Sequence, residues 1–490
     1  MRLRYRLLSV ILVFLMTINC MVFAFRFQTR VAQGNEASLR GDAFSAIEDA
    51  FNDTATLRLW YTDPSLTEYL NSRAVLWHEL NPDARLRIEL VSGIEYLEQI
   101  QKASTERAQN APDLFLVTHD TLEKAYLAGL ASAVTEYGEA LDATGYPKAA
   151  IDAVSFRGEQ IAYPFYFETA SLVYNRTYLE NAAKDALEDE ALQDGIALVN
   201  GEVPLEQSAI DERVETYLPH TISDIMTFAD SYNAPEEVVS VFTWDVNDIF
   251  NNYFFVGNYI DVGGPSGDDL AKISIYNTEA IRCLQVYQQL NQFFAIDAEE
   301  VSYEKIISEF IEGKMVFTVA TTDVLKKIEE AKNSGSCPYE FATAFIPDLT
   351  SELESRTMSV TNCVVVNGYT ENRELSHELA RFLSTDATDA MYLLSGKVPA
   401  YYGQLYKTNP DITTFVDVYA DSVPVSKMIE TSNFWVYLEI AFTEIWNGED
   451  ANDTLRHLSE QIMTQIAGEE YVELRLPDPP KDEVEETEED

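Results

Sequence analysis

Basic residues are scarce in this sequence. Its 490 residues include 34 lysines and arginines against 82 aspartates and glutamates, which gives a formal net charge of -48. Nucleic-acid binding depends on lysine and arginine side chains that neutralise phosphates. We therefore expect no nucleic-acid partner. The same charge also disfavours contact between the folded surface and anionic lipid.

Cysteine is scarce as well. The sequence has four cysteines, and they lack the close spacing of a disulfide framework or a metal site. They are Cys20, Cys283, Cys337 and Cys363. We expect buried, reduced thiols, with a bridge between Cys337 and Cys363 as the alternative.

Several active-site signatures are missing. The sequence contains no GxxxxGK[ST] phosphate loop, no GxGxxG after a strand, no HExxH, no CxxC and no GxSxG. His78-Glu79 and His377-Glu378 begin like zinc motifs, but neither is followed by a second histidine. We expect no cofactor and no metal. Acids are so abundant that a carboxylate pair for glycoside hydrolysis stays open as an alternative.

The N-terminus differs from the rest of the chain. Basic residues precede an apolar run over residues 7–25, and Val22-Phe23-Ala24 offers a small-residue cleavage site. This pattern predicts a signal peptide or a membrane anchor within residues 1–34, because the run is nearly long enough to span a bilayer. Lipid attachment at Cys20 is a third reading, although Asn19 stands where a small residue is usual. Residues 35–54 are polar and suit a spacer.

The chain after residue 54 alternates between two hydrophobic periods. Residues 55–62, 84–92 and 111–120 have strand patterns, and residues 66–77 and 96–108 repeat apolar side chains at helical spacing. Strands that alternate with helices predict the α/β class with a mainly parallel sheet. A chain of this length exceeds one hydrophobic core, so two lobes are expected.

Two segments are strongly acidic. Residues 180–215 contain many carboxylates and few basic residues, which predicts a solvated helical insertion or loop. Residues 471–490 are rich in proline and then in acids, which predicts a disordered tail.

Five stretches occur in a recognisable order between residues 55 and 468. They are APDLFLVTHDTLEKAYLAGLASAV, GEQIAYPFYFETASLVYN, FIEGKMVFTVATTDVL, ELARFLSTDATDAMYLLSGKVPAYYGQLY and NFWVYLEIAFTEIWNGEDANDTLRHL. In this order they resemble the extracellular solute-binding proteins of ABC importers, in the sugar-binding group typified by the maltose-binding protein.

The resemblance implies a two-lobed, periplasmic-binding-protein-like fold with a ligand cleft at the hinge. It assigns residues 55–167 and about 362–408 to lobe 1, and residues 168–361 and about 409–470 to lobe 2. It implies a monomeric, non-enzymatic receptor at the outer face of the cell membrane. The receptor would capture a small polar ligand, an oligosaccharide in the first instance, and deliver it to ABC permease subunits. A membrane-anchored surface or sensor protein and a secreted carbohydrate-active enzyme are the alternatives.

The resemblance also implies candidate ligand contacts. They are Trp60, Tyr61, Asp120, Glu168, Trp244, Asp245, Asp323, Tyr401 and Trp435. Aromatic side chains suit the apolar faces of sugar rings, and carboxylates suit their hydroxyls. Each candidate has a structural alternative. Asp120 would instead cap the helix starting at Thr121, Glu168 would form a hinge bond, and the tryptophans would pack in the core.

Two positions depart from the maltose-binding pattern. Val117 stands two residues before the pair His119-Asp120 at the strand end, where the maltose-binding protein has a tryptophan. Asp323 follows the Phe-x-x-Gly-Lys strand of the third stretch, where that protein has an aromatic residue. Two stacking surfaces are therefore missing. This puts maltodextrin in doubt as the ligand and leaves open an oligosaccharide of another shape or an unrelated small polar ligand. Asp323 would then bind ligand hydroxyls or cap a helix.

Overall fold

The structure is a computed structural model that describes residues 55–195, 203–294, 296–298, 300–385 and 388–480. The expected signal or anchor, Cys20 and the spacer lie outside these residues. The chain divides into two compact units. The described part of the first is Ala55, Thr56 and Val75–Leu86, in which the Asn81 amide donates to the Trp77 carbonyl at 2.8 Å. The second unit, Leu57–Ala74 and Arg87–Asp490, carries the features discussed below.

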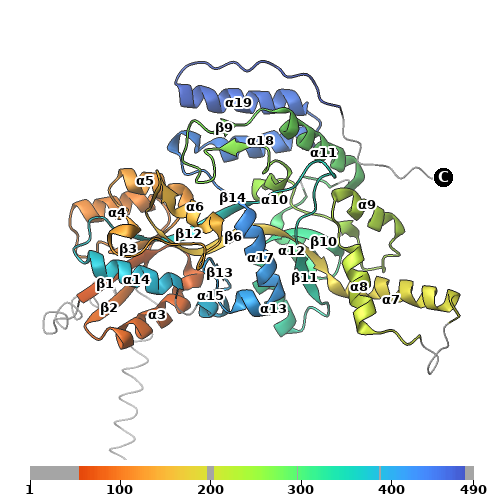
Figure 1. Cartoon of the computed structure of the whole chain (residues 1–490), viewed down its shortest axis with the longest axis horizontal. Coiled ribbons are helices and arrows are strands. Elements are labelled where there is room, and N and C mark those ends of the chain that lie inside the picture. The colour runs from red at the N-terminus through yellow and green to blue at the C-terminus, as the bar shows by residue number, and fades with distance from the viewer. Residues whose placement is uncertain (1–54, 196–202, 295, 299, 386–387, 481–490) are drawn as a thin grey trace, which may run out of the picture. The chain divides into compact units, whose positions relative to one another are not determined.

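One large sheet dominates the described residues. Its main path has the order β2-β1-β3-β12-β6-β10-β7, with β11 and β13 paired to β6 and β14 paired to β12 (Figure 1). The strands are β1 (Ala55–Tyr61), β2 (Ala84–Leu90), β3 (Leu114–Thr118), β6 (Tyr163–Asn175), β7 (Ser240–Phe242), β10 (Met315–Thr321), β11 (Phe341–Ala344), β12 (Met358–Val366), β13 (Val398–Pro399) and β14 (Val423–Pro424). Two small hairpins pair β4 (Ser155–Phe156) with β5 (Glu159–Gln160) and β8 (Asp261–Val262) with β9 (Ile273–Ser274).

Strand β6 connects the two ends of this sheet. Its first part pairs antiparallel with β12, where Tyr163 lies opposite Val364 and Thr169 opposite Ser359. Its second part pairs antiparallel with β10, starting at Ala170, and with β11. Parallel pairs flank this centre, with β1 beside β3 and β10 beside β7. The pairing is therefore mixed, because the strands that join the two ends run against their neighbours.

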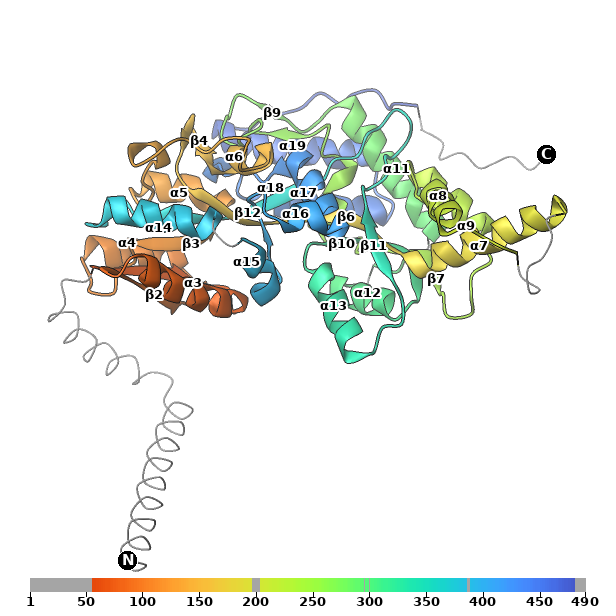
Figure 2. The same ribbon diagram turned by 60° about the horizontal axis from the view of Figure 1, so that its bottom comes forward.

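Helices flank the sheet (Figure 2). They are α3 (Thr67–Leu80), α4 (Tyr96–Thr105), α5 (Leu122–Leu127), α6 (Lys148–Val154), α7 (Arg176–Gln193), α8 (Gln207–Tyr217), α9 (Ile222–Ser231), α10 (Ile249–Asn252), α11 (Thr278–Phe294), α12 (Tyr303–Ile311), α13 (Val324–Ser334), α14 (Arg373–Thr385), α15 (Thr388–Ser395), α16 (Leu405–Thr408), α17 (Pro410–Asp421), α18 (Phe434–Trp446) and α19 (Ala451–Ala467). Short 3₁₀ turns are η1 (Pro64–Leu66), η2 (His119–Thr121), η3 (Val134–Glu136), η4 (Tyr253–Phe255) and η5 (Ile429–Thr431).

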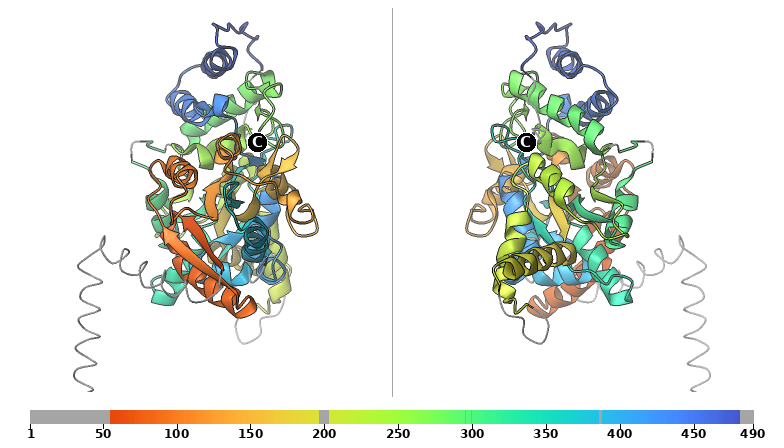
Figure 3. Two further views of the ribbon diagram at one scale, coloured as in Figure 1. Left: turned by 90° about the vertical axis from the view of Figure 1, so that its left-hand side faces the viewer. Right: turned by 90° about the vertical axis from the view of Figure 1, so that its right-hand side faces the viewer.

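Helices α11, α18 and α19 pack against one another (Figure 3). A large aromatic core includes residues of these helices and of the second part of β6. Its members include Phe242, Trp244, Phe255, Tyr287 and Trp446, all at most 2% exposed. The rings pack edge to face or stack, which adds to the stability gained from burial.

The acidic segment forms two helices that pack together, α7 and α8. Ile210 and Val214 of α8 are buried and anchor it to the aromatic core's cluster. Arg213 of α8 pairs with Glu190 of α7 at 2.9 Å, and Arg176 contacts both Glu180 and Asp211 at 2.8 Å. The remaining carboxylates can thus face solvent without loss of the helical fold.

The described cysteines are buried. Cys283, Cys337 and Cys363 form no disulfide, so the alternative of a Cys337–Cys363 bridge is wrong for this structure. Burial raises the pKa of the Cys363 thiol well above its ordinary value. The thiol is consequently unreactive at neutral pH.

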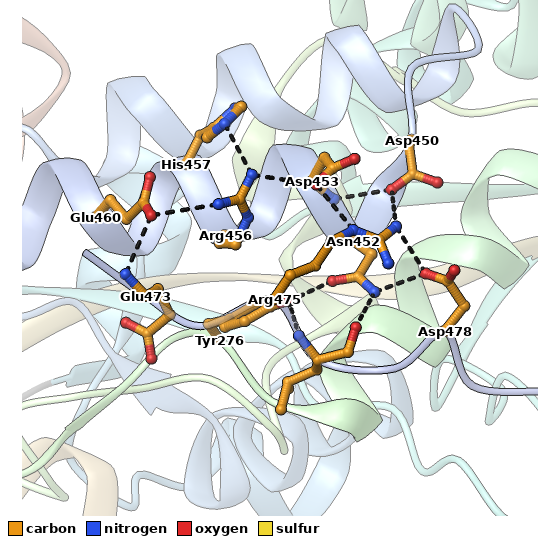
Figure 4. Close-up of polar contacts among 11 residues, drawn as sticks. Tyr276, Asp450, Asn452, Asp453, Arg456, His457, Glu460, Glu473, Arg475 and Asp478 are labelled. Carbon is orange, nitrogen blue, oxygen red and sulfur yellow. Dashed lines mark hydrogen bonds and ion pairs between the residues drawn. The ribbon is translucent and has the colours of Figure 1, made fainter.

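The chain after α19 follows that helix closely (Figure 4). Asn452 donates to the Leu476 carbonyl at 3.0 Å and to Asp478 at 2.7 Å, while Tyr276 donates to the Asn452 side-chain oxygen. Arg475 Nε donates to Asp453 at 3.0 Å. The composition predicted disorder from residue 471 onward. These contacts instead hold residues 473–478 against α19, because Arg475 pairs with Asp450 and Asp453 at the start of that helix.

Replacing Asn452 with alanine should release residues 473–478 from α19. Asn452 is 1% exposed and serves both as donor and as acceptor, so its loss should lower the free energy of unfolding by about 1 to 2 kcal/mol. Hydrogen exchange should rise at the Leu476 amide, which donates to the Tyr276 hydroxyl at 2.7 Å. The exposed Asn433→Ala variant is the control. Unchanged exchange at residues 473–478 in the Asn452 variant would contradict the assignment.

Candidate functional site

A cavity of about 330 Å³ opens where β1 and β3 end. The loop after β1, the loop before α4, the end of β3 and the middle of β6 and β12 supply its wall. The lining residues are Thr62, Asp63, Leu66, Gly93, Glu95, Tyr96, Leu97, Glu98, Leu116, Val117, Thr118, Thr121, Lys124, Tyr166 and Asn362. Loops that follow strands at one edge of an α/β sheet are a common place for ligands.

The cavity wall is rich in hydrogen-bond acceptors. It carries the carboxylates of Asp63, Glu95 and Glu98 and the amide of Asn362, against one ammonium group, that of Lys124. Ionised carboxylates only accept, so they match ligand groups that donate, such as hydroxyls. The wall therefore favours a ligand with many hydroxyl groups.

Glu95 has an unusual backbone conformation. Its φ of 51° lies in the left-handed region, at the residue that precedes α4. A side chain other than glycine pays roughly 1 to 3 kcal/mol for such a conformation. Its carboxylate is exposed and forms no cap hydrogen bond with the helix. The strain thus places an acceptor at the cavity wall rather than stabilising α4.

Asp63 joins the cavity to a small cluster of charges. Its carboxylate accepts from the Ser65 amide at 2.9 Å and lies 3.1 Å from the Lys397 ammonium. The same ammonium lies 3.1 Å from Glu168. Burial raises the pKa of Asp63, but the hydrogen bond from Ser65 and the Lys397 charge outweigh burial and hold that pKa below its ordinary value. Asp63 is therefore ionised at neutral pH.

Tyr166 forms an aromatic part of the wall. Its side chain is 4% exposed, and the Lys397 ammonium lies 5.1 Å from its ring centre. Burial, together with the charges of Asp63 and Glu168, raises the pKa of the Tyr166 hydroxyl well above its ordinary value. The hydroxyl consequently stays protonated and can donate.

Among the predicted residues, Glu168 and Asp120 lie nearest to this wall. Glu168 reaches Asp63 through Lys397, and its side chain is 40% exposed. Asp120 is exposed in η2, next to the lining residue Thr121. Thr121, not Asp120, holds the N-cap position of α5, so the alternative capping role of Asp120 is wrong.

The predicted aromatic residues of β1 point into the protein. Trp60 is 5% exposed and donates from Nε1 to Glu89 at 3.1 Å. Tyr61 is 2% exposed, and its hydroxyl lies 2.9 Å from that of Thr67. Both rings are buried and therefore offer little surface to a ligand.

The structure places Trp244 and Asp245 in the aromatic core. Trp244 has no exposed surface, and its ring stacks on Phe242 with centroids 4.9 Å apart. Its Nε1 donates to Asn252 at 2.8 Å. Asp245 is 6% exposed and accepts from the Asn247 amide at 3.0 Å. In this arrangement both side chains are covered by protein on every side.

The last predicted residues lie outside the cavity lining. Asp323 precedes α13 without a side-chain cap bond; it accepts from Tyr303 at 2.6 Å and pairs with Lys327 at 2.8 Å. Tyr401 packs edge-on against Tyr146 at 5.2 Å. Trp435 is half-buried in α18, and its ring lies 5.4 Å from that of Tyr253. Trp435 thus keeps one partly open face.

A model of the bacterial extracellular solute-binding proteins matches residues 78–405 of the chain. The chain belongs to this family. The resemblance drawn from the five sequence stretches is thereby confirmed at the level of the family. Family membership also places the protein among exported proteins.

Several known proteins are similar to this solute-binding protein. A maltotriose-binding protein of Pyrococcus abyssi (strain GE5 / Orsay) is 26% identical over 129 residues, which cover 23% of this chain and 28% of that protein. This chain thus matches about a quarter of the relative's length. A cyclo/maltodextrin-binding protein complexed with maltotetraose has a TM-score of 0.64 at 16% identity and is covered to 97%, against 85% of this chain.

An extracellular solute-binding protein from Staphylococcus aureus, solved with maltose, has a TM-score of 0.65 at 16% identity. The likeness covers 84% of this chain and 98% of that one. Such likeness shows a shared fold, so the expected two-lobed α/β class is confirmed. No helix in the described ranges of this solute-binding protein is long and apolar enough to cross a membrane. Those ranges also contain no cluster of potential metal ligands.

None of the nine predicted ligand contacts lines the cavity of this solute-binding protein, so sequence reasoning missed its lining residues. Asp63 follows β1 by two residues in the stretch YTDPS, which was a usable signal because strand ends carry ligand groups. Asn362 and Tyr166 lie within strands and gave no such signal. Lys397 is close to Glu168 only through the pairing of β13 with β6, which nothing local to either residue predicts.

Proposed function

We propose that this solute-binding protein captures an oligosaccharide in the cavity at the ends of β1 and β3 and delivers it to the permease of an ABC importer. The observation that carries this proposal is the wall itself, where Asp63, Glu95 and Glu98 offer acceptors for ligand hydroxyls. Sugars present rows of hydroxyls and apolar ring faces that match such a wall. The ligands named for the similar proteins, maltotriose, maltotetraose and maltose, support the same class.

For the lobes we propose residues 55–167 with about 362–408, and residues 168–361 with about 409–470. The change of partner along β6 near Glu168 supports the first boundary. The pairing of β12 with β3, which begins at Asn362, supports the second. Closure of the two lobes on the ligand would then be a hinge motion about β6 and β12. Trp435 is the proposed aromatic contact from lobe 2.

The protein acts as a receptor and not as an enzyme in this proposal. Asp63 pairs with the Lys397 ammonium, and its pKa lies below the ordinary value, which makes it a poor proton donor. Retention of the N-terminal segment as an anchor, rather than its cleavage, would tether the receptor beside its permease.

Binding of oligosaccharides to the full chain should raise its melting temperature. A ligand at one hundred times its dissociation constant adds about 2.7 kcal/mol to the free energy of unfolding. The panel comprises linear malto-oligosaccharides, oligosaccharides with other linkages and the parent monosaccharides, with the protein kept in mild detergent. Calorimetry then gives the affinities, and chromatography of the same mixtures detects any product.

Asp63→Asn should weaken this binding about tenfold, because a charged acceptor becomes a neutral one. Glu304→Gln is the matched control, since Glu304 is an exposed carboxylate in α12 that pairs with Lys327 at 2.7 Å. Absence of any thermal shift across the panel would count against the proposal, and hydrolysis of the bound sugar would replace it by an enzymatic one.

A further inference from the structure

Helices α13 and α15 lie in different proposed lobes and contact each other directly. Both are labelled in Figure 2. The Tyr392 hydroxyl of α15 donates to Glu329 Oε1 of α13 at 2.7 Å. Tyr392 belongs to residues 362–408 of proposed lobe 1, and Glu329 belongs to residues 168–361 of proposed lobe 2. This hydrogen bond therefore joins the two lobes at a place outside the connecting strands β6 and β12.

A close approach of the chain extends this contact. Gly396 directly follows α15, and its amide donates to the Tyr392 carbonyl at 2.7 Å, which continues the helical turn. A Cβ atom on Gly396 would lie 2.9 Å from Cγ of Lys326 in α13. Carbon atoms in favourable contact are roughly 3.5 to 4.0 Å apart. Glycine at this position thus lets the Lys326 side chain lie against the end of α15.

Tyr392 is a permanent donor in this contact. Its side chain is 3% exposed, and burial, together with the hydrogen bond to Glu329, raises the pKa of its hydroxyl well above the ordinary value. The hydroxyl therefore stays protonated at neutral pH. A hydrogen bond to a carboxylate is roughly twice as strong as one between neutral groups. The Lys326 ammonium lies 3.8 Å from Oε2 of Glu329, so both oxygens of this carboxylate have partners.

Each helix is anchored in its own lobe. Helix α13 follows β10, which pairs with the second part of β6, and Val324 at the start of α13 has no exposed surface. Helix α15 packs against η1 and β13, and its Met391 is fully buried. The turn η1 contains Leu66, which lines the proposed ligand cavity. Helix α15 therefore connects the cavity wall of lobe 1 with α13 of lobe 2.

Opening of the lobes must break this contact. A hinge motion about β6 and β12 moves each lobe as a unit, so Tyr392 would move away from Glu329 as the lobes separate. A ligand enclosed between the lobes is released only after they open. A contact that favours the closed form consequently slows dissociation, and dissociation rates account for most differences in affinity between variants of one site.

We infer that Tyr392 and Glu329 are positioning residues that latch the two lobes together and so slow the release of the bound ligand. Neither residue lines the cavity, so the pair acts on the ligand through the position of the lobes. This inference rests on the proposed function and adds to it a means of retaining the ligand.

The first test measures the distance between the lobes without any ligand. Spin labels at Glu212→Cys and Glu371→Cys, exposed positions in the two proposed lobes, are placed in the full chain with Cys20→Ser and read by pulsed electron paramagnetic resonance. The described native cysteines are buried and stay unlabelled. Tyr392→Phe should add a second population of distances to that of the wild type.

Matched variants separate the latch from a general effect on the fold. Glu329→Gln should change the distances in the same way as Tyr392→Phe, and the double variant should change them no further, because both remove one hydrogen bond. Glu330→Gln, an exposed neighbour in α13, should leave them unchanged. So should Tyr369→Phe, whose hydroxyl donates to the Ala128 carbonyl within lobe 1 at 3.4 Å.

The second test follows the binding of maltose, maltotriose and maltotetraose by calorimetry and stopped-flow fluorescence. For each sugar that the wild type binds, Tyr392→Phe should weaken binding about tenfold, mainly through faster dissociation. Tyr369→Phe should bind as the wild type does. An unchanged dissociation rate in Tyr392→Phe would overturn the role of the pair in retention.

The outcomes separate this inference from the proposed function. Unchanged distances in both Tyr392→Phe and Glu329→Gln overturn the latch, even where the melting temperature falls, and leave the proposed function standing. Failure of the wild type to bind any oligosaccharide overturns the proposed function and the retention of a sugar. The distances between the spin labels then still decide whether Tyr392 and Glu329 hold the lobes together.

Discussion

The Trp244→Ala variant is expected to lose about 3 to 5 kcal/mol of its free energy of unfolding, the range for removal of a large buried aromatic side chain. Trp244 has no exposed surface and contacts Phe242, Phe294 and Trp446 through its ring. Its indole Nε1 also donates a hydrogen bond to the side-chain oxygen of Asn252, and Asn252 is itself fully buried. The loss therefore combines a cavity with an unsatisfied amide oxygen.

Chemical denaturation of Trp244→Ala, Trp244→Phe and Trp435→Ala would measure this effect. Trp244→Phe should lose less, because a ring still fills most of the space. Trp435→Ala should be the mildest of the three, because Trp435 is only half-buried. Oligosaccharide affinity should be kept by Trp244→Phe. A marked loss of affinity without loss of stability in that variant would return Trp244 to the ligand site.

The second large effect concerns Lys427, a lysine that is 1% exposed. Its ammonium donates to the Ser155 carbonyl at 2.7 Å, to the Asp152 carbonyl at 3.1 Å and to the Ser266 carbonyl. Burial lowers the pKa of Lys427 from its ordinary 10.5 to about 8, although Asp268, Asp152 and Glu123 act in the opposite direction. Burial of the charged ammonium therefore lowers the free energy of unfolding.

The pH dependence has a definite sign. Between about pH 8 and pH 10.5 the unfolded chain keeps the proton on Lys427 and the folded chain releases it, so this group makes the free energy of unfolding rise with pH. The rise over that window is about 3 kcal/mol, from 1.36 kcal/mol for each pKa unit. Below pH 8 both states carry the proton and the contribution is constant.

Denaturation curves for the wild type and Lys427→Met, measured from pH 7 to pH 10.5, isolate this contribution. Tyrosines and thiols titrate in both proteins and cancel in the difference, which should grow by about 3 kcal/mol in favour of the wild type as pH rises. Lys305→Met controls for the loss of one lysine charge at the surface. If the free energies of unfolding of the wild type and Lys427→Met differ by the same amount at every pH, the lowered pKa of Lys427 is refuted.

Regular elements near the start of the described chain were predictable from pattern alone. The alternation in ATLRLWYT and the apolar run in DLFLVT correspond to β1 and β3, and the helical spacing after Ile94 corresponds to α4. These patterns report which faces are buried, and burial decides the secondary structure. Within the segment GEQIAYPFYFETASLVYN, Tyr163–Asn175 form the single strand β6, and Glu168 lies close to the point where its partners change from β12 to β10.

The candidate site was less predictable, because it depends on contacts between distant residues. The neighbours of Glu168 were not visible in the sequence, since Lys397 follows it by more than two hundred residues. Residue type alone also could not distinguish Trp244, which is buried in the core, from Trp435, which is half-buried on α18. Composition failed for residues 473–478, where Arg475 and Asn452 create specific contacts within an acidic sequence.

The pairing of β6 has a consequence for the timing of folding. This strand ends at Asn175, yet its partners β10, β11, β12 and β13 extend to Pro399, so its ladder needs segments made much later. Loop-closure entropy makes such distant pairing slow. During synthesis the central sheet therefore cannot be completed before the chain has been made as far as Pro399. For an exported protein this delay in folding is useful, because a chain without its completed sheet can still cross the membrane in an unfolded form.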